Sequence, residues 1–207
     1  MPSFQINPKH ANIYKGDIVA GSLLIPESRK IARLLLNRAD SAAWHQTVIV
    51  KNILQKRSPA AAKRQARLIR NRLALMGPEL WTMIDKGSSD IVTQALLAAA
   101  IKHSRFLGDF MDKIIREHWR TFKPKISNKD WETLFETCAQ IEPAILEWSQ
   151  TTMAKLRQVI FRILAEAKYI DGTRSLKLLP VSIVPEVRQY LKKHQENYVL
   201  RCMEVTT

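Results

Sequence analysis

A long basic stretch without any acidic residue is the part of this sequence best suited to chemistry. Residues 41–78 contain no Asp or Glu. Their bases are Lys51, Lys56, Arg57, Lys63, Arg64, Arg67, Arg70 and Arg72. Ammonium and guanidinium groups bind phosphates through charge attraction and hydrogen bonds, and arginine does so with a planar fork of donors. The stretch therefore predicts anion binding rather than bond-breaking chemistry.

The second half of this stretch has the signals of a helix over residues 58–76. Ser58 can cap the first free amides, Pro59 suits the first turn, and Gly77 with Pro78 ends the run. At 100° per residue the helix has two distinct faces. One face carries the candidate phosphate-contacting residues Lys63, Arg64, Arg67 and Arg70 beside Asn71, with Lys56 and Arg57 just before the helix. The other face carries Ala62, Leu68, Ile69, Leu73 and Met76.

The polar face of this helix has charges of one sign only. Exposed helices usually mix signs through Glu–Lys pairs one turn apart, so a face without carboxylates favours an anionic partner. Nucleic acid is the favoured partner, and a solvated face, a membrane surface or acidic residues elsewhere in the fold are the alternatives. Arg72 differs, because it projects from the apolar side. We expect a structural ion pair or a hydrogen-bonded role for it.

A second candidate surface lies in the helix predicted from the segment TTMAKLRQVIFRILAEAKYI, residues 151–170. Its polar residues follow one another in steps of four, three and four, which places them in one stripe suited to phosphates or base edges. They are Thr151, Lys155, Gln158 and Arg162. The core face is predicted to hold Leu156, Val159, Ile160, Ile163, Leu164 and Ala167. An Asp-Gly turn and a short alternating basic run follow, in which Arg174 would lie on a hairpin.

Helix, tight turn, helix and basic hairpin is the order of a winged helix-turn-helix. The charge division fits this interpretation, because the preceding residues 126–150 carry one base and five acids. Winged helices also serve as dimerisation or docking modules. DNA contact by this unit and a docking role are therefore both left open.

Charge and helix patterning predict a mainly α protein of two domains. The chain of 207 residues carries 33 Lys and Arg against 19 Asp and Glu, a net charge of +14. Residues 1–125 account for +13 and residues 126–207 for +1. The segment FKPKISN, residues 122–128, is the strongest linker signal, because it holds a proline and two lysines without periodicity. We expect a basic helical bundle over 1–125 and a small winged-helix-like domain over 126–207.

The residues that other function classes need are missing. There is no Walker-type loop, GxGxxG motif or GxSxG elbow. The five histidines have no ligand spacing with each other or with Cys138 and Cys202, which argues against a zinc site or a disulfide framework. Asp109 and Asp112 lie one helical turn apart and could hold Mg²⁺, but such pairs are usually solvated. We expect no enzyme activity, no cofactor and no small-molecule substrate.

The sequence also predicts where the protein works. No stretch reaches the roughly 18 apolar residues needed to cross a bilayer, and the N-terminus has no apolar signal core. Two distant cysteines suit a reducing compartment. We therefore expect a cytoplasmic protein without a membrane span. The tryptophans fall within apolar patterns and are predicted to be core residues rather than base-stacking platforms; they are Trp44, Trp81, Trp119, Trp131 and Trp148.

Three segments together resemble the BrxA family of bacterial BREX phage-defence systems. They are IYKGDIVAGSLLIPESRKIARLLL, VKNILQKRSPAAAKRQARLIRNRLALM and EWSQTTMAKLRQVIFRILAEAKYI. The resemblance implies a mostly helical protein whose main part looks like the antitermination factor NusB. It also implies double-stranded DNA binding without catalysis, alongside other BREX proteins. It assigns no catalytic residues, so the candidate DNA contacts come from charge and spacing alone.

Three alternatives to duplex DNA binding stay open. The protein could be a docking subunit whose apolar faces and acidic segment 126–150 bind other proteins. RNA binding follows from the NusB-like resemblance, but few aromatic residues accompany the bases, and single-strand readers generally need them. A membrane-surface helix ranks last, because the apolar arc of 58–76 has no Trp or Phe anchor.

Overall fold

The computed structural model describes residues 13–206, and these residues are mainly helical, as predicted. The α-helices are α1 (Ile25–Leu36), α2 (Ser41–His45), α3 (Pro59–Ala74), α4 (Pro78–Lys86), α5 (Ser89–His103), α6 (Arg105–Asp109), α7 (Arg116–Arg120), α8 (Asn128–Ile141), α9 (Gln150–Glu166), α10 (Pro185–Lys193) and α11 (Asn197–Met203). Two 3₁₀ turns are η1 (Gly16–Ala20) and η4 (Pro143–Glu147). Two π-helical turns are η2 (Gln46–Val50) and η3 (Phe110–Ile115).

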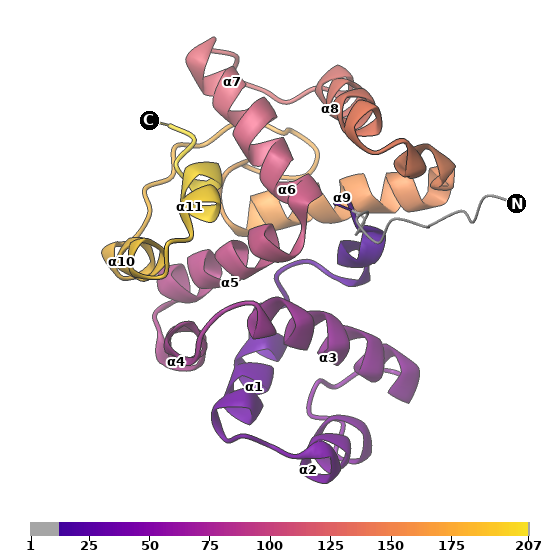
Figure 1. Ribbon diagram of the computed structural model, residues 1–207, viewed down its shortest axis with the longest axis vertical. Helices are drawn as coiled ribbons and strands as arrows, with labels where there is room; N and C mark the ends of the chain where they lie inside the picture. Colours follow the sequence, from indigo (N-terminus) through magenta and orange to yellow (C-terminus); the bar gives the residue numbers. More distant parts are fainter. Residues whose placement is uncertain (1–12, 207) are drawn as a thin grey trace, which may run out of the picture.

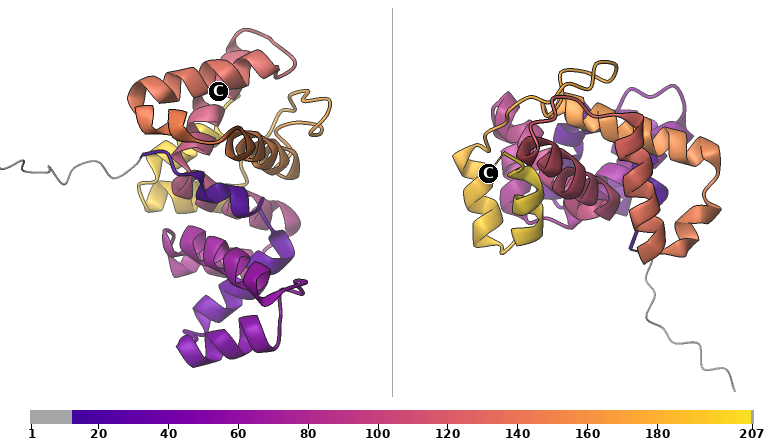
Figure 2. Two further views of the ribbon diagram at one scale, coloured as in Figure 1. Left: turned by 90° about the vertical axis from the view of Figure 1, so that its right-hand side faces the viewer. Right: turned by 90° about the horizontal axis from the view of Figure 1, so that it is seen from above.

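Helix α5 lies at the centre of the molecule. Figure 1 shows α1 to α4 gathered at one end, the α6–α9 region at the other, and α5 between them. The side view in Figure 2 has the same order. Every residue of α5 from Gln94 to Ile101 is buried, and Val92 is buried too. A helix that is apolar on all sides belongs in a core, which explains its position.

Helix boundaries follow local signals in the sequence. Asp40 caps α2, Ser58 caps α3 and Ser149 caps α9, each by accepting a hydrogen bond from a backbone amide of the first turn. Ser127 and Asp130 form a capping box at the start of α8. These short-range signals explain why most predicted helices are present.

Three details differ from the sequence-based expectation. The acidic segment EPAILEWSQ, residues 142–150, is expected from its sequence to form a helix, but it forms only the short 3₁₀ turn η4. The expected basic hairpin is limited to isolated antiparallel bridges: Ile170 pairs with Leu178 within it, and Lys177 pairs with Lys125 of the segment before α8. The sequence predicts one closing helix from Pro185, but the described chain ends in two, because Gln195 adopts a positive φ of 55° between α10 and α11.

The buried side chains before and after position 125 belong to one hydrophobic cluster. It joins Ile31 of α1 and Leu97 of α5 to Ile160 of α9 and Met203 of α11. Trp131 is buried within it, and the other four tryptophans are partly buried and pack against it, as core residues would. The division into 1–125 and 126–207 stays a prediction. No helix among residues 13–206 is both long and apolar enough to cross a membrane.

A buried carboxylate ties distant segments of this core together. Asp109 is 1% exposed and accepts hydrogen bonds from the hydroxyls of Tyr14 and Tyr198, both at 2.8 Å. Arg105 and Lys113 pair with it at 2.8 and 3.1 Å. Burial alone raises the pKa of Asp109, but the two tyrosine hydroxyls, Lys113 and Arg105 outweigh it and hold the pKa below its usual value.

This network predicts a specific acid sensitivity. A carboxylate with a lowered folded-state pKa stabilises the fold above its unfolded pKa of about 3.9 and loses that contribution as pH falls further. Asp109→Asn should therefore lower the urea midpoint at pH 7, and the gap from wild type should shrink between about pH 5 and 2.5. Glu132→Gln, an exposed carboxylate, controls for the change in net charge. A gap that stays constant over this range would contradict the role of Asp109.

Candidate nucleic-acid interface

Helix α3 presents the basic face that its sequence predicts. Lys63, Arg64, Arg67, Arg70 and Asn71 are all exposed. The opposite face is buried and holds Ala62, Ala66, Leu68, Ile69 and Leu73, with Met76 just beyond the helix end. The two-sided pattern of 58–76 is thus confirmed as a packing pattern.

The cations on this face lack acidic partners. Lys63, Arg64 and Arg67 form no ion pair with any carboxylate among residues 13–206. The guanidinium of Arg70 lies over the ring of Trp44, 4.8 Å from its centroid, which orients it without neutralising it. The face is therefore strongly electropositive.

The two bases that precede α3 differ from each other. Arg57 is exposed. Lys56 is half-buried and pairs with Glu27 of α1 at 2.5 Å. The backbone of Lys56 is also held by the side chain of Asn52. Lys56 therefore fixes the loop before α3 against α1 instead of adding a free charge.

Arg72 is buried, as its position on the apolar side predicts. Its guanidinium donates to the backbone oxygen of Ser22 at 2.5 Å and to that of Gly21 at 2.9 Å. Burial lowers the pKa of Arg72 to about 10, and the charges of Asp17 and Glu166 oppose that fall. The side chain stays protonated at neutral pH, so it binds carbonyl dipoles as a cation. The expected hydrogen-bonded role is confirmed.

Helix α9 carries the predicted polar stripe on its exposed side. Thr151, Lys155, Gln158 and Arg162 are all exposed, and Lys155 Nζ lies 3.0 Å from Gln158 Oε1. The predicted core residues of this helix, Leu156, Val159, Ile160, Ile163, Leu164 and Ala167, are all buried. Arg174 is exposed in the turn between the bridged residues Ile170 and Leu178, apart from this stripe in sequence.

The two basic helices meet at one hollow. A pocket of about 420 Å³ lies between α3, α9 and the segment from Val19 to Leu24, and Figure 1 shows η1 lying between the two helices. Arg64 of α3 and both Lys155 and Arg162 of α9 line it, and no acidic side chain does. The structure thus brings together residues nearly a hundred positions apart in the sequence. Arg57, Arg174 and Thr151 do not line this pocket.

A clamp on residues 21–23 holds this arrangement in place. Glu166, one turn beyond Arg162 on α9, accepts hydrogen bonds from Ser22 Oγ at 2.7 Å and from the backbone amide of Leu23 at 2.9 Å. Arg72 of α3 holds the carbonyls of Gly21 and Ser22 from the other side. The carboxylate of Glu166 is therefore already occupied by neutral donors.

The sequence did not predict that residues 21–24, the connector GSLL between η1 and α1, complete this site. Nothing in GSLL indicates that its backbone bridges two helices, because its conformation depends on Arg72 and Glu166. Leu24 adopts a positive φ of 52°, a conformation that favours glycine and leaves no mark in the sequence when another residue takes it. The one available signal was Arg72, a cation on an apolar helix face.

No metal site accompanies these residues. The part of the chain that the structure describes contains no group of three His, Cys, Asp or Glu side chains able to hold an ion. Asp112, considered above with Asp109 for Mg²⁺, pairs with Arg116 at 3.1 Å and with Arg201 at 2.5 Å. Both carboxylates thus bind protein cations.

Comparison with known proteins identifies the family. The BrxA family model matches residues 12–195. The chain belongs to the BrxA family. A BREX protein BrxA from Paramagnetospirillum magneticum is 46% identical over 193 residues, covering 93% of this chain and 97% of the relative. A BREX protein BrxA from Escherichia coli O9:H4 is 32% identical, covering 95% and 92% respectively.

A solved structure has the same overall fold as this chain. The crystal structure of an uncharacterized protein from Magnetospirillum magneticum matches with a TM-score of 0.87 and 44% identity. The match covers 94% of this chain and all of that chain. The arrangement of helices described above is therefore shared with that protein.

The clamp predicts that replacing Arg72 lowers the stability of the fold far more than replacing an exposed arginine of the same helix. Arg72→Met removes a buried cation and leaves two carbonyls without donors, so the free energy of unfolding should fall by about 2 to 4 kcal/mol. Arg67→Met, on the exposed face of the same helix, should change it by less than about 0.5 kcal/mol. Urea unfolding followed by far-ultraviolet circular dichroism measures both. Equal stability of the two variants would show that the clamp contributes little.

Proposed function

We propose that this protein is a non-catalytic accessory protein of a bacterial BREX phage-defence system and that it binds double-stranded DNA. Membership of the BrxA family supports the system, because the relatives carry the name BREX protein BrxA. The partner class rests on the surface chemistry of α3 and α9. Other proteins of the same system would be its protein partners.

The observation that carries the DNA proposal is the hollow where Arg64, Lys155 and Arg162 converge without a carboxylate. Like charges gathered around one concave surface repel each other and raise the local positive potential. A phosphate entering the hollow relieves that repulsion and gains charge-assisted hydrogen bonds. Released counterions add to the favourable free energy.

The same surface extends along both helices. On α3, Lys63, Arg67 and Arg70 would contact phosphates beyond the hollow, with Arg57 at the start of the helix. On α9, Thr151 and Gln158 offer hydrogen-bonding groups that suit phosphates or base edges. Because phosphate contacts dominate, binding should depend weakly on sequence and steeply on salt.

We further infer that the segment 126–207 contains a winged helix, formed by α8, η4, α9 and the hairpin that follows. The supporting observations are the order α8, η4, α9 and the two bridges that pair Lys125 with Lys177 and Ile170 with Leu178. In such a unit α9 would be the recognition helix, and Arg174 would lie on the wing. The NusB-like arrangement of the preceding helices stays a prediction.

Duplex DNA is favoured over single-stranded RNA by the side chains available. Readers of single strands stack bases on exposed aromatic rings. The ring nearest the basic face, Trp44, is half-buried and covered by Arg70. The docking alternative would need an acidic protein partner to cover α3 and α9 in place of phosphates.

Charge reversal tests which helix contacts DNA. Because Arg64, Lys155 and Arg162 share one hollow, Arg64/Arg67/Arg70→Glu and Lys155/Arg162→Glu should each weaken binding to a 25-base-pair duplex by at least about tenfold. Fluorescence anisotropy measures the affinities. Arg38/Lys86/Lys192→Glu and Lys86/Lys192→Glu are matched controls, because these bases are exposed and have no ion pair among residues 13–206.

If neither variant binds more weakly than its control, or if wild type ignores duplex DNA, the docking function replaces this proposal. If only Arg64/Arg67/Arg70→Glu loses affinity for the duplex, the winged unit serves for docking. If single-stranded RNA binds more tightly than the duplex, the RNA alternative holds.

The salt dependence gives an independent test. Each phosphate contact contributes about −0.9 to the slope of log K against log salt concentration for duplex DNA. Wild type should have a slope of roughly −4 to −6, and both variants should have shallower slopes than their controls. A slope near zero would indicate that phosphates are not the ligand.

A further inference from the structure

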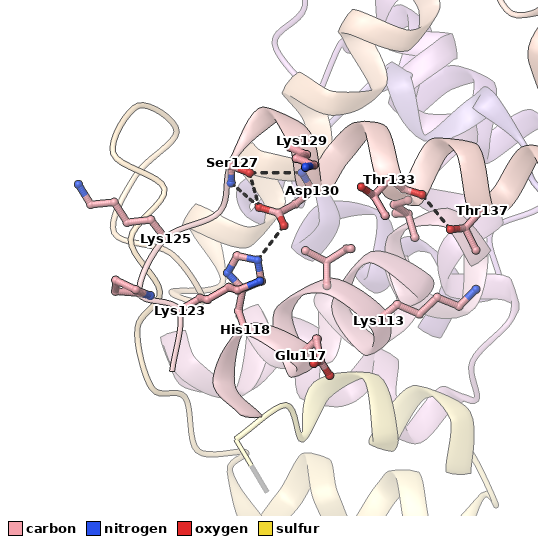
Figure 3. A pocket seen from close by; sticks show the side chains of 13 residues that line it. Lys113, Glu117, His118, Lys123, Lys125, Ser127, Lys129, Asp130, Thr133 and Thr137 are labelled. Carbon is pink, nitrogen blue, oxygen red and sulfur yellow. Dashed lines mark hydrogen bonds and ion pairs between the residues drawn. The ribbon is translucent and has the colours of Figure 1, made fainter. Parts of the chain in front are cut away.

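A second concave surface lies away from the basic hollow. It is a groove of about 740 Å³ between η3–α7 and α8, and Figure 3 shows it from close by. Ile114 and His118 lie on one wall, and Thr133 and Thr137 lie on the other. It shares no lining residue with the hollow between α3 and α9.

The floor of the groove is apolar and one of its ends is basic. Leu134 is buried and Ile114 is half-buried, so a ligand would contact hydrocarbon between the helices. Lys123, Lys125 and Lys129 lie at the end where α7 turns into α8. None of these three lysines pairs with a carboxylate among residues 13–206.

The carboxylate nearest these lysines is occupied. Asp130 accepts from the Ser127 amide at 2.7 Å, from Ser127 Oγ at 2.6 Å, and lies 2.9 Å from His118 Nε2. Burial alone raises the pKa of Asp130, but Ser127 and His118 lower it below its usual value. Asp130 is thus held as a carboxylate by other donors, and the lysine end keeps its positive potential.

One buried atom in the groove lacks a partner. His118 is 4% exposed, and its Nδ1 has no hydrogen bond among the described residues. A buried polar atom left unpaired is unfavourable and uncommon.

Exposed apolar side chains lie just beyond the groove in sequence at both ends. Phe122, immediately before Lys123, is 91% exposed. Ile141 is 51% exposed and lies one turn beyond Thr137 on the same face of α8. From Asp130 to Ile141 the helix is roughly 16 Å long, which matches about three turns of a bound helix.

We propose that this groove binds a short acidic segment of a partner protein. Apolar side chains of the segment would pack on Ile114 and Leu134, and its carboxylates would pair with Lys123, Lys125 and Lys129. This is recognition of an amphipathic segment by a hydrophobic groove with a charged end. A duplex backbone fits less well, because it offers no apolar side chains to pack on Ile114 and Leu134.

The test begins with random dodecapeptides displayed on phage and selected on the full-length protein. Enriched sequences should combine acidic residues with at least one large apolar residue. Synthetic fluorescein-labelled copies should bind wild type, and Lys123/Lys125/Lys129→Glu should weaken that binding at least tenfold. Thr133→Trp, a substitution at an exposed position that fills the groove without changing its charge, should do the same.

Matched variants separate this site from the proposed DNA site. Arg38/Lys86/Lys192→Glu carries the same change in net charge as the lysine variant and should bind the peptide as wild type does. Arg64/Arg67/Arg70→Glu should keep peptide binding, and Thr133→Trp should keep duplex binding. The experiment can thus disprove peptide binding in the groove while DNA binding is retained. It can equally disprove DNA binding while peptide binding is retained.

The proposal is overturned if no acidic sequence is enriched, or if the peptides bind Thr133→Trp as tightly as wild type. It is also overturned if Lys123/Lys125/Lys129→Glu loses duplex affinity far beyond its matched control while peptide binding is unaffected. That result would assign the three lysines to a nucleic-acid surface.

Discussion

The clamp on residues 21–23 is the constraint on which the candidate interface depends. Arg72 of α3 binds two backbone carbonyls of this connector, and Glu166 of α9 binds a hydroxyl and an amide of the same residues. A buried cation and a partly buried carboxylate thus attach two helices to one short piece of backbone. Because each charge is hydrogen-bonded to neutral groups, neither requires an exposed partner that would disturb the basic surface.

The segment just before the clamp is fixed as well. Asp17 of η1 pairs with His103 of α5 at 3.2 Å, and Tyr14 donates to Asp109 in the central core. The N-terminal segment is therefore attached to α5 and α6 as well as to α3 and α9. The relative position of the two basic helices follows from the same contacts that complete the core.

The molecule presents two concave surfaces of different chemistry. The hollow between α3 and α9 has cations and no acidic lining residue. The groove beside α8 combines an apolar floor with carboxylates and with three lysines that have no carboxylate partner among residues 13–206. One of the carboxylates, Asp130, is bound to Ser127 and His118. A phosphate backbone suits the first surface, and a protein segment with both apolar and acidic side chains suits the second.

Local signals in the sequence determined most helices and their faces. Ser58 and Pro59 set the start of α3, and the spacing of Leu68, Ile69 and Leu73 determined which side is buried. The π turn η3 was not foreseen, because Phe110, Ile114 and Ile115 also suit an ordinary α-helix. The break at Gln195 was missed because a positive φ at a residue other than glycine has no sequence signature.

The sequence by itself therefore determined two basic helix faces and the burial of Arg72, since both depend on the period of one helix. Only the tertiary structure decided that Arg64, Lys155 and Arg162 share a hollow. It also decided that Lys56 is paired with Glu27 and that three lysines surround the end of a groove. These relations depend on contacts such as that between Ser22 and Glu166, which are 144 residues apart. Helical periodicity carries no information about contacts between residues so far apart, because side-chain packing and long-range hydrogen bonds determine those contacts.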